Sequence, residues 1–186
     1  NLSGLAVAGA TWTETGGLTV PGYYPYAGMK EVGLGIDLPN GDFESGMVRP
    51  CQSRGNATID LNDTDPQNTT LQVTAGNQND GAQISLNGWV DESDQVYVNF
   101  WAKADSGIST LKVVLGVNND SNITDNVKTI SVNTGWQEYN VHFKEVDCNG
   151  GDCGTTYLDF ILNSDVGGAG DVANFYLDNV SLQSVL

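Results

Sequence analysis

One stretch of the chain combines aromatic and amide side chains at a spacing suited to ligand binding. Residues 95–104 are expected to form a strand, whose side chains alternate between two faces. The aromatic and polar members share the face opposite the apolar one: Tyr97, Asn99, Trp101 and Lys103. Aromatic rings can cover the C–H surface of a sugar while amides bond to its hydroxyls, so this pattern is typical of carbohydrate recognition. The alternative is that Trp101 packs across strands beneath a loop.

A second expected strand, residues 156–163, carries further candidates. The same alternation turns Leu158 and Phe160 inward and Tyr157 and Asp159 outward. We predict that Tyr157 and Asp159 share one groove with Trp101.

The elements that must position these residues are strands. Glycine is plentiful at 23 residues, and apolar residues occur in short alternating runs separated by Asn, Asp, Gly and Thr. This pattern predicts an all-β protein, a jelly-roll β-sandwich of two antiparallel sheets. Residues 47–68 are expected to be a long loop containing one short strand at 57–61. The other strands are expected at 70–75, 82–90, 95–104, 110–118, 127–132, 137–144, 156–163 and 174–183.

Charge and hydropathy narrow the possible partners. Seven basic against 23 acidic residues give a formal charge of -16. Nucleic acids and anionic membranes are disfavoured because the protein lacks the positive charge that neutralises phosphates. No apolar run approaches the roughly 18 residues needed to cross a bilayer. A glycan is therefore expected to be neutral.

Motifs at the two ends of the chain point to a family. Residues 40–46 read NGDFESG, and residues 175–182 read FYLDNVSL. Between them stand a Thr-rich run, a Gly-Ala-Gln run at 81–83 and the Trp101 strand, in that order. Together these patterns resemble the calcium-containing β-sandwich carbohydrate-binding modules of the family 4, 9, 16 and 22 kind. The resemblance covers residues 40–186.

The resemblance implies where a ligand and a metal would bind. In such modules a concave sheet holds the glycan, and matching positions here are Tyr97, Asn99, Trp101, Tyr157 and Asp159, with Gln83 on the preceding strand. The resemblance also implies a structural Ca²⁺ held by Glu44 and Asp178 together with backbone carbonyls. Two carboxylates and several hard oxygens suit this ion. The alternative is that these acids are edge charges that discourage aggregation.

The cysteines and the beginning of the chain raise separate questions. Cys148 and Cys153 enclose a glycine-rich turn, so a disulfide between them is plausible and would leave Cys51 over. Such a bond would place the protein outside the cytosol, secreted or at a cell surface. Residues 1–39 have no counterpart in the resemblance and are expected to form an extension that packs on the sandwich or leads into it.

No catalytic constellation is recognisable. The chain contains no nucleophile elbow, no metal-binding His pair and a single histidine, His142. We therefore predict no enzymatic activity, but a non-catalytic carbohydrate-binding module that targets an attached polysaccharide-degrading enzyme to a glycan chain. A catalytic domain in the same parent chain, a glycoside hydrolase or polysaccharide lyase, is the expected partner. The alternative is a calcium-stabilised adhesin or cell-surface sandwich domain that contacts a protein.

Overall fold

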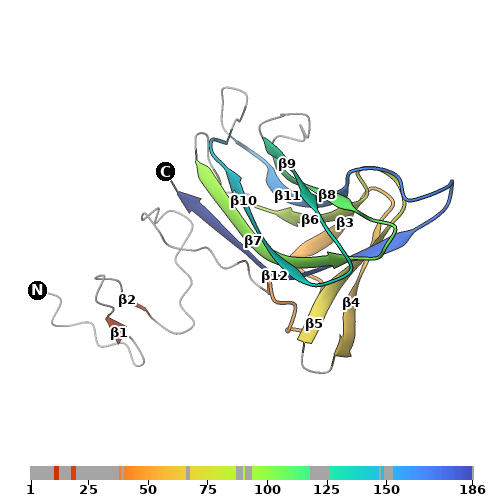
Figure 1. Ribbon diagram of the computed structural model, residues 1–186. Coiled ribbons are helices and arrows are strands. Elements are labelled where there is room, and N and C mark those ends of the chain that lie inside the picture. The colour runs from red at the N-terminus through yellow and green to blue at the C-terminus, as the bar shows by residue number, and fades with distance from the viewer. Residues whose placement is uncertain are drawn as a thin grey trace, which may run out of the picture.

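The architecture is a sandwich of two five-stranded antiparallel sheets, seen in a computed structural model (Figure 1). The structure describes residues 11–12, 18–19, 38, 40–65, 68–86, 90, 94–117, 126–146, 148 and 153–185. These segments include no helix long and apolar enough to cross a membrane. The predicted all-β, two-sheet fold is confirmed.

The described residues form twelve strands. Their bounds are β1 Thr11–Trp12, β2 Leu18–Thr19, β3 Cys51–Arg54, β4 Thr58–Asp65, β5 Asn68–Ala75, β6 Gly81–Ser85, β7 Gln95–Ala104, β8 Thr110–Val117, β9 Val127–Ser131, β10 Gln137–Phe143, β11 Thr156–Leu162 and β12 Ala173–Val185. β1 and β2 pair with each other. The prediction for residues 47–68 was wrong, because β3 and an eight-residue β4 occupy most of this range.

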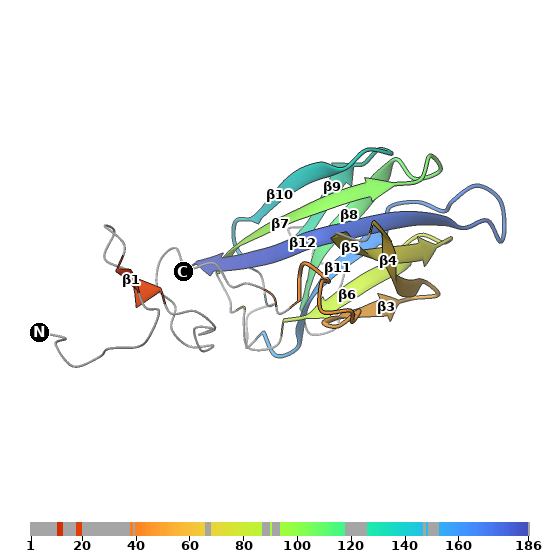
Figure 2. The same cartoon turned by 90° about the horizontal axis from the view of Figure 1, so that it is seen from below.

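The two sheets are named here by their central strands. The β12 sheet has the order β10-β7-β12-β5-β4, and the β11 sheet has the order β3-β6-β11-β8-β9. Figure 1 shows β12 running between β7 and β5, and Figure 2 shows the same sandwich from below. The chain passes repeatedly from one sheet to the other, although the consecutive strands β4 and β5, and likewise β8 and β9, pair within one sheet.

The core lies between the sheets and follows the alternation of each strand. Its largest fully buried side chains are aromatic: Phe43, Phe100, Phe143, Phe160 and Phe175. On β7 every second residue, from Val96 to Ala104, is buried, as the period of two predicts. Burying apolar surface stabilises the fold by about 25 cal/mol per Å².

The opening motif at residues 40–46 lies against the last strand. Gly41 and Val180 are joined by a hydrogen bond from the Val180 amide to the Gly41 carbonyl, 2.8 Å long. A Cβ at Gly41 would lie 2.0 Å from the Val180 carbonyl oxygen, so only glycine allows this approach. Phe43 is fully buried at positive φ, and it anchors the motif in the core.

Candidate functional site

The six ligand-binding candidates do not meet in one place. Tyr97, Asn99 and Trp101 lie on β7 and point outward from the β12 sheet, whereas Gln83, Tyr157 and Asp159 lie on β6 and β11 in the other sheet. The prediction that Tyr157 and Asp159 share a groove with Trp101 was wrong. Alternation separates inward from outward residues on each strand, but it does not say which sheet the strand joins.

A row of polar side chains crosses three strands of the β11 sheet. Gln52 on β3, Gln83 on β6 and Asp159 on β11 are cross-strand partners in register. Gln52 Nε2 donates to Gln83 Oε1 at 2.8 Å, and Gln83 Nε2 donates to Asp159 Oδ1 at 2.9 Å. The amide of Gln83 is therefore fixed from both sides.

Arg54 completes this row from the edge strand. Its Nη1 donates to Asp159 Oδ2, so the two Asp159 oxygens are held by two different side chains. Asp159 is fully buried, whereas the Arg54 side chain keeps 20% of its surface exposed. A buried carboxylate requires a partner of this kind. A guanidinium has five N–H donors, so Arg54 can bond to a hydroxyl while remaining paired.

Tyr157 is positioned by a glycine on the neighbouring strand. It pairs with Gly116, where a Cβ would lie 2.0 Å from the tyrosine ring. The ring thus lies across Gly116 and is only 7% exposed. Tyr157 points outward from its sheet as predicted, but it is mostly covered. We name the outward side chains of Gln52, Arg54, Gln83, Tyr157 and Asp159 the Arg54 face.

Two members of the Arg54 face were missed by sequence reasoning. Gln52 and Arg54 lie on β3, which has four residues at the edge of its sheet. Its burial pattern offers little alternation, because Gln52 and Ser53 are both exposed. The usable signal was Arg54 itself, one of seven basic residues in a strongly acidic chain.

The outward side of the β12 sheet is aromatic and exposed. Trp101 is 40% exposed, and its cross-strand partners are the acids Glu138 and Asp178. Asn99 accepts a 2.6 Å hydrogen bond from Asn140 Nδ2 on β10. The three predicted residues of β7 therefore do share one face.

Further rings flank Trp101 along β7. Tyr97 stacks on His142 with centroids 4.1 Å apart and an interplanar angle of 7°. Lys103 Nζ lies 5.0 Å from the Trp136 ring and 4.8 Å from the Tyr176 ring. Burial and the Asp105 charge raise the pKa of Tyr176. We name these outward residues the Trp101 face: Tyr97, Asn99, Trp101, Lys103, Trp136, Glu138, Asn140, His142 and Tyr176.

The two acids expected to bind calcium are neighbours in the structure. Glu44 Oε1 accepts from the Thr69 amide at 2.7 Å, and Asp178 accepts from Asn68 Nδ2 at 3.2 Å. Burial raises the pKa of the Asp178 carboxyl, and the charges of Glu44 and Asp42 raise it further. An added positive charge would be favourable beside these like charges.

The donor set at this point fits a hard cation only with help from the backbone. Among the described residues, no three His, Cys, Asp or Glu side chains are grouped closely enough to hold a metal ion. Calcium takes 6–8 oxygen ligands, and carbonyls commonly supply them. Glu44 and Asp178 would be its two charged ligands, and carbonyl or amide oxygens would have to complete the coordination.

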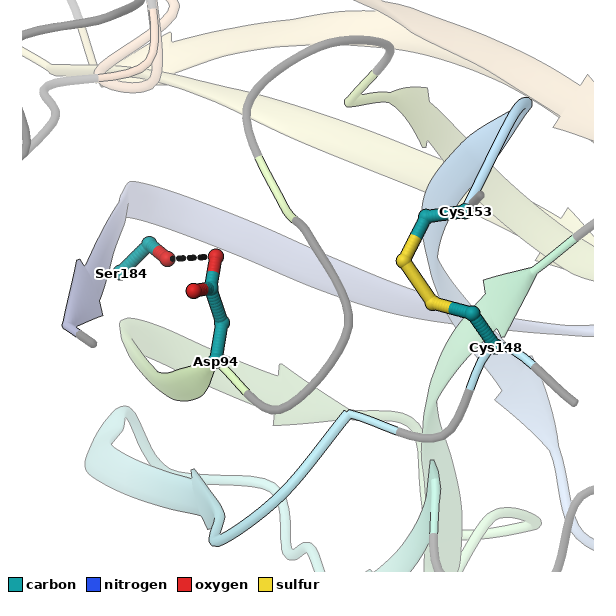
Figure 3. Close-up of a disulfide and its surroundings, with 4 residues drawn as sticks. All are labelled: Asp94, Cys148, Cys153 and Ser184. Atoms are coloured by element: carbon teal, nitrogen blue, oxygen red, sulfur yellow. Dashed lines mark hydrogen bonds between the residues drawn. A yellow bond between two sulfur atoms is a disulfide. The ribbon is translucent and has the colours of Figure 1, made fainter. Parts of the chain in front are cut away.

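A disulfide joins Cys148 and Cys153, as predicted, with Cα atoms 4.9 Å apart (Figure 3). It closes the connection between β10 and β11. Figure 3 also shows Asp94, whose Oδ2 accepts a 2.7 Å hydrogen bond from the Ser184 hydroxyl. Cys51 is free and buried, and burial raises the pKa of its thiol to about 12. It is therefore an unreactive core residue.

Comparison with known proteins gives one family. The model of a carbohydrate binding domain, CBM_4_9, matches residues 38–146, which is more than half of the chain. This range contains the opening motif, all of β3 to β10 and most of both faces. No curated protein matches the chain.

Solved structures share the fold at low sequence identity. The CBM22-1 xylan-binding domain of Paenibacillus barcinonensis Xyn10C has a TM-score of 0.59 and 17% identity, covering 77% of this chain and 91% of that one. The family 11 module of Clostridium thermocellum, in complex with a β-1,3-1,4-mixed-linked tetrasaccharide, has a TM-score of 0.50 and 14% identity over 78% and 94%. A CBM22-1-GH10 structure of Clostridium thermocellum Xyn10B with xylohexaose has a TM-score of 0.50 and 15% identity over 72% and 26%.

Proposed function

Because the chain belongs to the carbohydrate-binding domain family CBM_4_9, we propose that it is a non-catalytic module that binds a polysaccharide chain on its Arg54 face. The observation that carries this assignment is the hydrogen-bonded row formed by Gln52, Gln83 and Asp159, with Arg54 paired to the buried carboxylate.

The row is suited to a ligand rich in hydroxyl groups. Asp159 lies underneath and orients Arg54 and Gln83, so it acts as a positioning residue. Gln52, Gln83 and Arg54 remain at least partly exposed and offer both donors and acceptors. Since these groups are already ordered, a glycan loses less conformational entropy on their side of the interface.

A neutral polysaccharide is the ligand that the charges favour. The chain carries a net charge of -16, and the positive charge of Arg54 is matched by Asp159. A polyanion would therefore meet a repulsive field, which Lys112 on β8, in register with Ile161, offsets only in part. A xylan-binding domain and a module in complex with a β-1,3-1,4-mixed-linked tetrasaccharide, both structurally similar to this chain, support xylan and mixed-linkage β-glucan as the first probes.

In its parent chain the module would hold a polysaccharide-degrading catalytic domain at the substrate. A tethered binding site raises the effective concentration of the attached domain on the glycan without any new contact with it. This role requires a secreted or cell-surface location. The Cys148–Cys153 disulfide supports such a location, because these bonds persist in oxidising compartments.

A structural Ca²⁺ is part of the same proposal. Glu44 and Asp178 would hold it between the opening motif and the last strand. When bound, the ion would supply positive charge to a place where Asp42, Glu44 and Asp178 repel one another. The two segments are already joined through Gly41 and Val180, so the ion would stabilise an existing contact.

The test is binding to soluble xylan and mixed-linkage β-glucan by affinity electrophoresis. We expect Gln52→Ala combined with Gln83→Ala to weaken binding at the Arg54 face at least tenfold, while circular dichroism stays unchanged. Ser53→Ala is the matched control, because Ser53 lies on β3 between Gln52 and Arg54 and is exposed. A folded wild-type protein that binds no glycan would overturn the proposal and favour the adhesin alternative.

A further inference from the structure

We propose that the Trp101 face is a second binding site for a neutral polysaccharide chain, so that one module can hold two chains on opposite sides. The site goes beyond the Arg54 face, because the two sets of side chains point outward from different sheets.

Trp101 lies at the centre of this face, and no ring contact in the described part of the sheet explains its presence there. Its ring is 40% exposed, and its cross-strand partners are charged residues, Glu138 and Asp178. Among the described residues, Trp101 takes part in none of the stacking or cation–π contacts of the sheet. A large aromatic side chain left exposed between acids is poorly explained by packing, whereas an available indole ring is what stacking on a sugar requires.

Amides stand beside the ring along β7. Asn99 Oδ1 accepts from Asn140 Nδ2 at 2.6 Å, and Asn140 is exposed on β10. Each carboxamide has two N–H donors and an oxygen with two lone pairs, so the pair keeps free donors and acceptors. The mutual bond fixes the orientation of both amides before a ligand arrives.

Ordered rings mark both ends of the face. At one end Tyr97 stacks on His142, whose Nε2 lies 3.3 Å from Gln95 Oε1. At the other end Lys103 lies over the rings of Trp136 and Tyr176. From position 97 to position 103 the strand advances about 20 Å, at 3.3–3.4 Å per residue. The face is therefore long enough for an oligosaccharide to span several aligned groups.

Charge selects a neutral chain as the occupant. On this face the cation of Lys103 is held against aromatic rings, and Glu138 and Asp178 flank Trp101. A polyanionic glycan would meet the exposed carboxylate of Glu138 beside Trp101, whereas Asp178 is buried. Between Trp101 and Tyr97 the groups are uncharged amides, which match hydroxyl groups. A protein partner is the competing occupant and forms an outcome of the test below.

Two sites on opposite faces have a consequence for binding. A single glycan chain that lies on one sheet does not contact the other, so the sites are filled by different chains or by distant parts of one chain. Binding to a dense polysaccharide would then gain from avidity, because occupation of one face raises the local concentration of chains at the other.

The test is the stoichiometry of binding to short neutral oligosaccharides, xylohexaose and a mixed-linked β-glucan tetrasaccharide, measured by calorimetry on the full chain. We expect two sites in the wild type and one in Trp101→Ala. The Arg54-face double variant, Gln52→Ala with Gln83→Ala, should also retain one site, and combining all three substitutions should abolish binding. Val172→Ala is the control, since Val172 is 63% exposed outside both faces.

The outcomes separate the two proposals. One site in the wild type, unchanged by Trp101→Ala and lost in the Arg54-face double variant, would overturn the second site and leave the first intact. Binding lost with Trp101→Ala alone would overturn the first. If Trp101→Ala disturbs the circular dichroism spectrum, Asn140→Ala takes its place, with at least a tenfold weakening expected at the second site. A protein ligand captured through Trp101, without any glycan bound there, would also refute the proposal.

Discussion

The Arg54 face buries the carboxylate of Asp159, whereas the Trp101 face exposes the ring of Trp101. Asp159 is fully buried and Tyr157 is 7% exposed, although both point outward from their sheet. Trp101 points outward from the other sheet and is 40% exposed. The difference shows that a side chain can point away from the core and still be shielded from solvent. One face therefore offers a glycan polar groups fixed by hydrogen bonds, and the other offers an exposed aromatic ring.

The two faces should contribute differently to folding stability. On the Arg54 face, ligand groups are fixed by interactions that also contribute to folding, so damage there should reduce stability and binding together. On the Trp101 face, the exposed ring contributes little to the folded state and should matter for binding alone. Substitutions that probe stability can therefore test the comparison.

Removal of the Arg54 charge should have the largest effect on stability. In Arg54→Ala the buried Asp159 loses its cation, and we expect a loss of about 3 kcal/mol in the free energy of unfolding, the low end for a broken buried pair. Urea denaturation measures this loss. The matched control is Lys103→Ala on the Trp101 face, where an exposed cation–π contact contributes only about 0.5–1 kcal/mol. Equal losses of unfolding free energy in Arg54→Ala and Lys103→Ala would contradict the expected difference between the two faces.

Filling the space beneath Tyr157 should have the next largest effect. A methyl group at Gly116 would lie 2.0 Å from the ring, so Gly116→Ala must displace Tyr157. We expect a loss of about 1–3 kcal/mol, typical of overpacking. In the Tyr157→Ala background the same glycine substitution should be much less harmful, and a double-mutant cycle measures this coupling. Additive losses would show that the ring does not depend on Gly116.

The stability effect of Asp178 should depend on calcium and on pH. The pKa of Asp178 is raised in the folded state by burial and by its acidic neighbours, so its ionised form opposes folding without a metal. This destabilisation is absent below the unfolded-state pKa of about 3.9 and is fully present above the folded-state pKa. Without calcium, Asp178→Asn should therefore raise the thermal midpoint at pH 7 and leave it unchanged at pH 3.

With calcium the sign should reverse. Calcium at 100 times its dissociation constant would add about 2.7 kcal/mol to the wild type, and Asp178→Asn should lose most of this gain. Thermal unfolding with calcium and with a chelator measures it. A wild-type midpoint that does not respond to calcium would rule out the metal site and leave the acids as edge charges.

Truncation of Trp101 should have the smallest effect on stability. The ring is 40% exposed and takes part in none of the ring contacts of the described residues, so Trp101→Ala should change the free energy of unfolding by no more than about 1 kcal/mol. Urea denaturation checks this value beside the Arg54→Ala measurement. A loss above about 2 kcal/mol would mean that Trp101 packs as a structural residue, as the alternative interpretation of the sequence held.

The sequence predicted what local patterns can encode. Alternation on β7 identified its inward and outward residues, and the glycine-rich spacing between Cys148 and Cys153 indicated their disulfide. The assignment of strands to sheets could not be predicted, because β7 and β11 show the same alternation although they belong to opposite layers. A groove combining Trp101 with Asp159 was therefore a reasonable hypothesis that the topology contradicts.

Burial that depends on neighbouring strands could not be predicted from the sequence either. Asp159 is buried where Gln83 on β6 and Arg54 on β3 donate hydrogen bonds to it. With four residues, β3 is too short to show an alternation of polar and apolar residues. Tyr157 is covered because it meets a glycine, a partner that is known only once the register is fixed.

The most direct test of the central claim is a calorimetric titration of the folded, calcium-loaded chain with neutral and acidic polysaccharides in parallel. We expect saturable binding to a neutral β-glycan, lost when Gln52→Ala and Gln83→Ala are combined with Trp101→Ala, and no binding to a polyanionic glycan. Absence of heat with every neutral polysaccharide, or a preference for the acidic ones, would contradict it.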